Sequence, residues 1–258
     1  MIRTYHEDNY TEYETLLTAL GLDVFSAPII SVVGAGGKTT VIERLSREYM
    51  TLHQPVIVTT TTHMKCPDVP YLLGAPDMIE FARIIRRQRI AWLGIPDGEG
   101  KIGAFPMAFL EAVRILGIPM LIEADGAKEK PCKVPAAHEP VLWGKTTTVI
   151  GVFGLDAVGR TIEEACHRPE PAAALLCKSA KERITCGDIV TIGLSEQGMK
   201  KNMDPFMRYR IVLNKADTKE RLEYAKEITG LFAGQGFCDV ITAAGLGGSH
   251  ADIDQRSR

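Results

Sequence analysis

The sequence predicts an α/β protein with a mostly parallel sheet of about seven strands, flanked by helices in a three-layer arrangement. Short runs rich in Val and Ile recur along the chain, and segments of helical length lie between most of them. The first of these runs is followed by a glycine-rich loop and then by a helix. This alternation is typical of βαβ units with right-handed crossovers.

The predicted strands are apolar along most of their length, as strands covered on both faces are. They span residues 29–33, 56–59, 90–93, 120–123, 148–153, 211–214 and 240–242. The predicted helices span residues 39–50, 77–87, 106–116 and 219–232. Residues 160–208 differ, because they contain consecutive helical stretches at 170–176 and 186–194 without an evident strand. We therefore expect one domain over residues 1–258, with a helical insertion at about 160–208 and a frayed polar end at 251–258.

Composition limits the classes of function. The hydrophobic fraction of 45% and the charged fraction of 24% are ordinary for a globular protein. The net charge of -2 gives no reason to expect nucleic acid or an anionic membrane as a partner. No apolar run approaches the roughly 20 residues that span a bilayer, and residues 1–13 lack the apolar core of a signal peptide. We therefore expect a cytoplasmic protein with six reduced cysteines, while soft-metal or selenium chemistry at one of them stays open.

The glycine-rich loop predicts a phosphate site. It contains Gly34, Ala35, Gly36, Gly37, Lys38, Thr39 and Thr40. Glycines let backbone N–H groups approach an anion, and the helix N-terminus adds a partial positive charge. We expect Lys38 to reach the terminal phosphates and the Thr39 hydroxyl to bind Mg2+. The alternative is a glycine turn that precedes an ordinary helix.

The order strand, glycine loop, helix makes the predicted fold P-loop NTPase-like. The loop is shorter than the GxxxxGK[ST] pattern, because Val32 stands where that pattern has its first glycine. In this respect it is similar to the loops of Mur-type ligases and of some accessory ATPases and GTPases.

Polar residues follow two further strands. The second strand ends in the run Thr59-Thr60-Thr61-Thr62-His63, in which we expect Thr61, or alternatively Thr62, to contact Mg2+ or a γ-phosphate. The alternative for this run is β-propensity followed by a polar turn. Glu123 and Asp125 end another strand on the same side, where a cation would relieve their repulsion. We expect Asp125 to bind Mg2+. We also expect three residues to be catalytic, namely Lys38, Glu123 and Asp125. The alternative for the two acids is an exposed acidic pair.

The run Asn214-Lys215-Ala216-Asp217 matches N-K-x-D, the motif with which GTPases read guanine. An ionised Asp217 can accept both the N1–H and the N2–H2 donors of guanine. We expect the Lys215 stem to pack along the base and Asn214 to brace neighbouring loops. Thr242 and Ala243 lie where GTPases carry a short loop that touches the base. The alternative is a strand-end turn with a helix cap at Asp217.

Several segments together resemble the YqeC family, across about residues 28–248. They are VGAGGKTT (33–40), TTTTH (59–63), EADGA (123–127), PAAHEP (135–140), GVFGLD (151–156), CHRPE (166–170) and NKAD (214–217). The resemblance implies a role in maturation of molybdenum hydroxylases that carry labile selenium, and kinship with metallocentre-maturation GTPases. It assigns Lys38 and Thr39 to phosphate and Mg2+, Asp125 to the metal, and Asn214 with Asp217 to the base. The short loop and the absence of Asp from residues 59–62 depart from those GTPases.

We therefore expect Mg2+-dependent binding and hydrolysis of GTP (or ATP). The expected client is a hydroxylase of this kind, and the expected partners are that client or its maturation proteins. An ATP-dependent ligase or kinase acting on a cofactor precursor is one alternative. A non-enzymatic nucleotide-binding scaffold is the other. A homodimer stays open, and His138, Asp156 and His167 have no assigned role beyond loop pinning or contact with a ligand.

Overall fold

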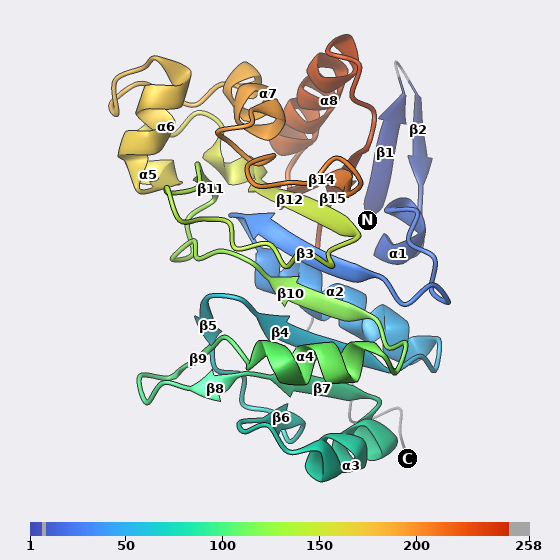
Figure 1. Cartoon of the computed structure of the whole chain (residues 1–258). Coiled ribbons are helices and arrows are strands. Elements are labelled where there is room, and N and C mark those ends of the chain that lie inside the picture. Colours follow the sequence, from blue (N-terminus) through green and yellow to red (C-terminus); the bar gives the residue numbers. More distant parts are fainter. Residues whose placement is uncertain (7–8, 248–258) are drawn as a thin grey trace.

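A ten-stranded sheet forms the centre of the computed structural model, which describes residues 1–6 and 9–247 (Figure 1). Its strands are, in spatial order, β2 (Asn9–Glu12), β1 (Ile2–His6), β15 (Val240–Ala243), β14 (Arg208–Asn214), β12 (Thr148–Gly154), β3 (Ile29–Gly34), β10 (Met120–Glu123), β4 (Val56–Thr60), β7 (Ile90–Leu93) and β6 (Leu72–Leu73). The strands from β15 to β6 are parallel, and β1 and β2 add an antiparallel edge. The prediction of a mostly parallel sheet flanked by helices is confirmed.

Each of the predicted strands is present, as β3, β4, β7, β10, β12, β14 and β15. The strand count of about seven was too low, because β6 and the β1–β2 hairpin also join the sheet. The hairpin lacks an apolar signal, since every residue of β2 is exposed. The predicted frayed end at 251–258 lies outside the described residues.

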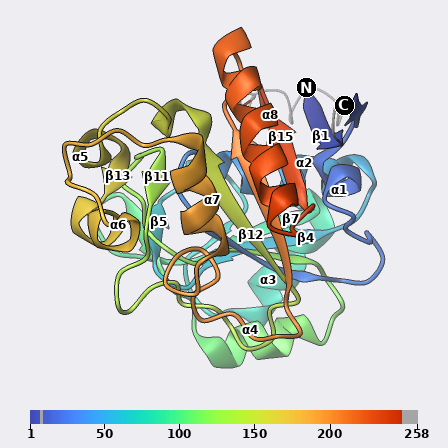
Figure 2. The ribbon, with the colours of Figure 1, turned by 90° about the horizontal axis from the view of Figure 1, so that it is seen from above.

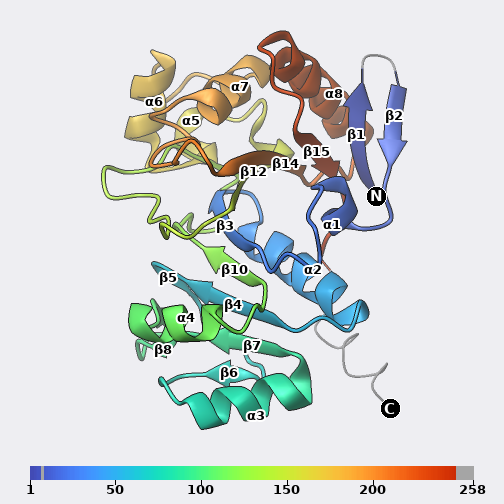
Figure 3. The ribbon, with the colours of Figure 1, turned by 45° about the vertical axis from the view of Figure 1, so that its right-hand side comes forward.

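Helices cover both faces of the sheet. They are α1 (Leu16–Ala19), α2 (Lys38–Thr51), α3 (Met78–Gln88), α4 (Met107–Arg114), α5 (Ile162–Ala165), α6 (Pro169–Leu176), α7 (Cys186–Leu194) and α8 (Lys219–Gly234), with a 3-10 turn η1 (Leu155–Ala157). The crossovers β3–α2–β4 and β14–α8–β15 run toward opposite edges of the sheet. Right-handed crossovers therefore place α2 and α8 on opposite faces. Figures 1 and 3 show α2 and α4 on opposite sides of the sheet, and Figure 2 shows α7 beside α8.

The insertion at 160–208 is not purely helical. It contains α5, the short strand β13 (Cys166–His167), α6 and α7. Strand β13 pairs in parallel with β11 (Cys132–Lys133), so that His167 lies opposite Lys133. The expectation of an insertion without a strand is therefore wrong, because two-residue strands give no periodic signal. The pairing fastens the insertion to the segment that follows β10.

A second small sheet, of β5 (His63–Lys65), β9 (Lys101–Gly103) and β8 (Ile95–Pro96), is antiparallel. No helix in the described part of the chain is long and apolar enough to cross a bilayer.

The strand order places a topological switch point at β3. The chain leaves β3 for β4 on one side, whereas β12, β14 and β15 lie on the other side. In open α/β sheets, ligands bind outside the carboxyl ends of the strands at such a point. The carboxyl ends of β3, β10 and β12 are therefore the place where a site is expected.

Candidate functional site

The glycine loop turns sharply between β3 and α2. Gly34, Gly36 and Gly37 have φ angles of 95°, 81° and 119°, a region that favours glycine. A Cβ atom on Gly36 would lie 2.0 Å from the backbone nitrogen of Gly154, and one on Gly37 would lie 2.3 Å from the Asn214 amide nitrogen. The loop is therefore packed tightly between the ends of β12 and β14.

The backbone N–H groups of the loop divide into two sets. Those of Gly34, Ala35 and Gly36 donate to Asp125 Oδ2 at 3.0 Å, to the Val152 carbonyl at 3.0 Å and to the Lys130 carbonyl at 2.9 Å. The first turn of α2 receives no side-chain cap. Because the first N–H groups of a helix have no intrahelical partner, these are the donors that the loop offers to an anion.

Lys38 lies buried beside the two acids of β10's carboxyl edge. Its ammonium donates to the Gly34 carbonyl at 2.8 Å and lies 3.1 Å from Asp125 Oδ1 and 4.0 Å from Glu123 Oε1. The Thr39 hydroxyl donates to Glu123 Oε2 at 2.9 Å. The structure thus brings together four residues that sequence analysis selected: Lys38, Thr39, Glu123 and Asp125.

The environment disfavours the ionised form of Glu123. Burial raises the pKa of Glu123, and the charge of Lys38 and the Thr39 hydrogen bond offset the increase only in part. A bound cation would favour the ionised form. The donor set fits Mg2+, which binds through one or two carboxylates and completes its shell with phosphate oxygens and water. No group of three or more His, Cys, Asp or Glu residues that could hold a metal ion occurs among the described residues.

A series of charged side chains, mostly buried and not selected from the sequence as a site, continues from Asp125. Lys133 Nζ lies 3.2 Å from Asp125 Oδ2 and 2.7 Å from Glu139 Oε2, and it also donates to the Gly126 carbonyl at 2.6 Å. Arg168 Nη1 donates to the same Glu139 oxygen at 2.8 Å. We call Lys38, Asp125, Lys133, Glu139 and Arg168 the charge chain. It connects the glycine loop to the N-terminus of α6 in the insertion.

The charge chain makes the stability of the protein depend on pH, through Glu139. Burial opposes ionisation of Glu139, but the hydrogen bond and charge of Lys133 prevail and lower its pKa from 4.5 to about 2. The stability that Glu139 contributes is therefore complete above about pH 5 and is lost as the pH falls toward 2.

We expect Glu139→Gln to lower the free energy of unfolding by about 1–3 kcal/mol at pH 7, because the carboxylate that accepts from Lys133 and Arg168 is lost. The difference from the wild type is expected to shrink as the pH falls below about 4.5, because Glu139 of the unfolded chain takes up a proton there while the folded carboxylate stays ionised. Urea unfolding at a series of pH values between 7 and 3.5 measures this difference. A difference that stays constant with pH would contradict the assignment.

The threonine run lies next to the acids, but its hydroxyls are already engaged. Thr59 donates to the Leu93 carbonyl at 2.8 Å and Thr60 to the Glu123 carbonyl at 2.8 Å. The Thr61 hydroxyl, selected as a metal ligand, donates to the Val141 carbonyl at 2.7 Å. The Thr61 N–H also donates to the Glu123 carbonyl at 3.2 Å, which keeps the run beside β10.

The N-K-x-D run lies at the carboxyl end of β14. Asn214 Nδ2 donates to the Gly36 carbonyl at 2.9 Å, so this side chain holds the glycine loop. Lys215 Nζ lies 2.9 Å from Asp156 Oδ2. Asp217 Oδ1 accepts the Gly245 N–H at 3.0 Å, and its side chain is 49% exposed. The run is therefore adjacent to the glycine loop on one side and to residues 243–247 on the other.

The remaining residues selected from the sequence differ in burial and in hydrogen bonding. Thr242 is fully buried, and its hydroxyl has no hydrogen-bond partner within the described ranges. The Ala243 carbonyl accepts the Ala216 N–H at 3.0 Å, which ties β15 to the N-K-x-D run. His138 is exposed. Burial, with the charges of Arg168 and Lys133, lowers the pKa of His167. The six cysteines are free thiols.

Two comparisons with known proteins agree. A family model described as YqeC protein matches residues 30–170. A protein of Escherichia coli (strain K12), described as "Uncharacterized protein YqeC", is 30% identical over 181 residues, which cover 68% of this chain and 71% of that protein. The region matched by the family model contains the glycine loop, both acids and the charge chain, and it ends before Asn214.

Proposed function

The chain belongs to the YqeC family, and we propose that it is a P-loop NTPase-like protein that binds and hydrolyses a nucleoside triphosphate with Mg2+, with GTP favoured over ATP. Such a cycle would support maturation of a selenium-dependent molybdenum hydroxylase. That client class rests on the family resemblance alone, and the nucleotide rests on the site.

The observation that carries the proposal is the position of Lys38. Its side chain is 4% exposed, and its ammonium lies beside Asp125 and Glu123, at the uncapped start of α2. A polyanion at this point would gain the ammonium and the first N–H groups of the helix together. It would compete for Lys38 with the Gly34 carbonyl and with Asp125, which hold the ammonium in the present arrangement.

The residues that would hold Mg2+ are Thr39, Glu123 and Asp125, and the ion would neutralise charge on the phosphate oxygens. Lys38 would stabilise the charge that develops on the transferred phosphoryl group. Glu123 or Asp125 would accept a hydrogen bond from the attacking water and orient it. Asn214 keeps the loop in place through its bond to the Gly36 carbonyl.

A ligase or kinase that uses ATP is the second candidate, and one feature of the base-reading residues favours it. Lys215 is held in an ion pair with Asp156, and Asp217 already accepts the Gly245 N–H. To recognise guanine, Asp217 would have to accept the N–H donors of the base. It would do so either in addition to the Gly245 N–H or in place of it.

Replacing Asp217 with alanine tests the choice of base. Because losing the partner of a hydrogen-bonded polar group is worth about 1–3 kcal/mol, we expect Asp217→Ala to weaken GTP binding about 5- to 150-fold and to leave ATP binding unchanged. Isothermal titration of GTP and ATP with Mg2+ measures both affinities. Asp204→Ala, at an exposed aspartate outside the N-K-x-D run, is the matched control. A wild-type preference for ATP would reject guanine reading in favour of the ligase or kinase.

A further inference from the structure

Two of the six cysteines lie opposite each other in the small ladder that fastens the insertion. Strands β11 and β13 pair in parallel, and their register places Cys132 directly opposite Cys166. Figure 2 shows the two strands side by side, next to α5 and α6. Adjacent strands lie about 4.8 Å apart, and the Cα atoms of a disulfide lie about 4.4–6.8 Å apart. The register therefore gives the two backbones a separation that a bond between these cysteines can span.

The two thiols also face the same side of the ladder. Successive side chains of a strand point to opposite faces, so Cys132 and Cys166 share one face, whereas Lys133 and His167 share the other. A hydrogen bond with the Cys166 thiol, followed by burial, raises the pKa of Cys132 well above its ordinary value. Because the two thiols interact directly, a bond between the sulfurs requires little movement of either side chain.

The charge chain holds both strands of the ladder in this register. Lys133, which follows Cys132, donates to Glu139 Oε2 at 2.7 Å. Arg168, two residues after Cys166, donates to the same oxygen at 2.8 Å. Both backbones are therefore restrained close to the thiols. Such preorganisation raises the effective concentration of one thiol for the other.

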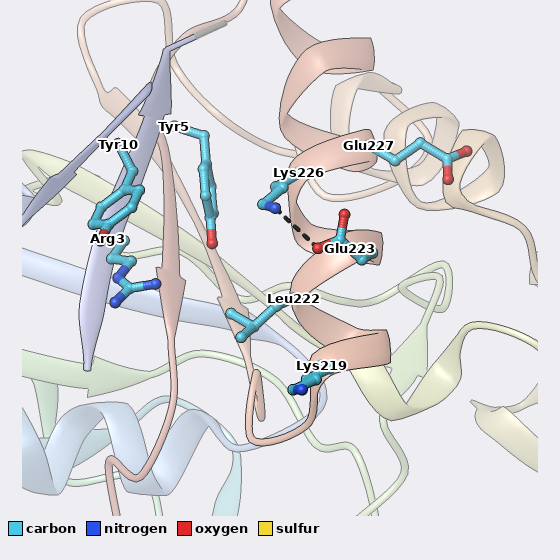
Figure 4. Close-up of a pocket in the computed structure, with 8 residues that line it drawn as sticks. All are labelled: Arg3, Tyr5, Tyr10, Lys219, Leu222, Glu223, Lys226 and Glu227. Carbon is cyan, nitrogen blue, oxygen red and sulfur yellow. Dashed lines mark hydrogen bonds and ion pairs between the residues drawn. The ribbon is translucent and has the colours of Figure 1, made fainter. Parts of the chain in front are cut away.

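Burial protects the pair while the ladder is closed. Cys132 is 0% exposed and Cys166 is 1% exposed, and the reactive form of a cysteine is the thiolate, which burial disfavours. The cavity in Figure 4 is lined by residues of β1, β2 and α8, so it does not reach the pair. An oxidant therefore meets these thiols when the insertion opens locally. The ladder that must open has two residues on each side.

We propose that Cys132 and Cys166 form a reversible disulfide, which locks the insertion to the segment that follows β10. The oxidant is a small-molecule disulfide such as oxidised glutathione. In the opened state, one protein thiolate attacks a sulfur of the oxidant and releases one glutathione thiolate, which leaves a mixed disulfide. The other protein thiolate attacks the protein sulfur of this mixed disulfide and releases the second glutathione thiolate.

The reaction balances without a further reagent. The two cysteines lose two protons and two electrons, and the oxidant takes them up to become two thiols. The inference is independent of the proposed nucleotide, because the exchange uses neither Lys38 nor the acids of β10.

Mass spectrometry of the full chain tests the proposal, after equilibration with reduced and oxidised glutathione and blocking of the remaining thiols. We expect a product that has lost two hydrogen atoms, and a peptide map in which Cys132 is linked to Cys166. We also expect the urea midpoint of the oxidised protein to lie about 1 M above that of the same protein reduced with dithiothreitol, because the bond restrains the unfolded chain.

Matched cysteine variants separate this pair from the other thiols. Cys177→Ser and Cys238→Ser each remove an exposed thiol, and both are expected to form the bond and to show the rise in midpoint. Cys132→Ala and Cys166→Ala are expected to show neither. The peptide map of the wild type decides the linkage even where a variant folds poorly. The proposal is overturned if the wild type carries only glutathione adducts, if the linked peptides join other cysteines, or if oxidation leaves the urea midpoint unchanged.

Discussion

Lys38→Ala is expected to weaken binding of a nucleoside triphosphate about 10- to 150-fold, because a hydrogen bond to a charged group is worth about 1.5–3 kcal/mol. The ammonium of Lys38 is buried at the start of α2, so water screens its attraction for phosphate poorly. The loss is expected to be greater for the triphosphate than for the diphosphate if Lys38 reaches the terminal phosphate. Titration of both nucleotides with and without Mg2+ measures the difference.

The same substitution also removes the cation that faces two buried acids. Asp125 would keep Lys133 at 3.2 Å, whereas Glu123 would lose its nearest cation among the described residues. Urea unfolding must therefore accompany the titration. Thr39→Ala provides a variant that leaves every ion pair in place, and we expect it to weaken the Mg2+ dependence of binding. Lys128→Ala, at an exposed lysine, is the control. Normal triphosphate affinity in a folded Lys38→Ala protein would refute the phosphate site.

The sequence alone identifies the strands that carry the candidate site, because each is an apolar run followed by polar residues. Strand β10 is an example. Its four residues are buried, and the alternation of side chains brings both Glu123 and Asp125 toward Lys38. The glycine loop is equally local, since its turn depends on positive φ angles at Gly34, Gly36 and Gly37.

The charge chain could not be predicted in the same way. Lys133 stands in a segment without periodicity, and a lysine is ordinarily exposed. Its burial depends on Asp125, which precedes it, and on the side chain of Glu139, which Arg168 of the insertion also binds. The β11–β13 pairing that brings the insertion to this place consists of two residues on each side. Contacts of this kind become visible only when the whole chain has folded.

Replacing Lys133 with methionine is expected to lower the free energy of unfolding by about 3–5 kcal/mol, because removing one partner of a buried ion pair leaves an uncompensated charge. Lys133 is fully buried and serves Asp125, Glu139 and the Gly126 carbonyl at once. Methionine preserves most of the volume of the side chain, so the loss would report charge and hydrogen bonding more than a cavity.

A double variant separates this charge effect from packing. Glu139→Gln removes the carboxylate that Lys133→Met leaves without its lysine, so we expect the combined loss to be smaller than the sum of the single losses by about 0.5–3 kcal/mol. Lys200→Met, at a partly exposed lysine paired with the exposed Glu196 at 3.1 Å, is the control and is expected to change stability by no more than about 1 kcal/mol. Urea unfolding at pH 7 measures the wild type, both single variants, the double variant and the control. Additive losses, or a loss for Lys133→Met no larger than for the control, would show that the buried lysine does not hold the two acids together.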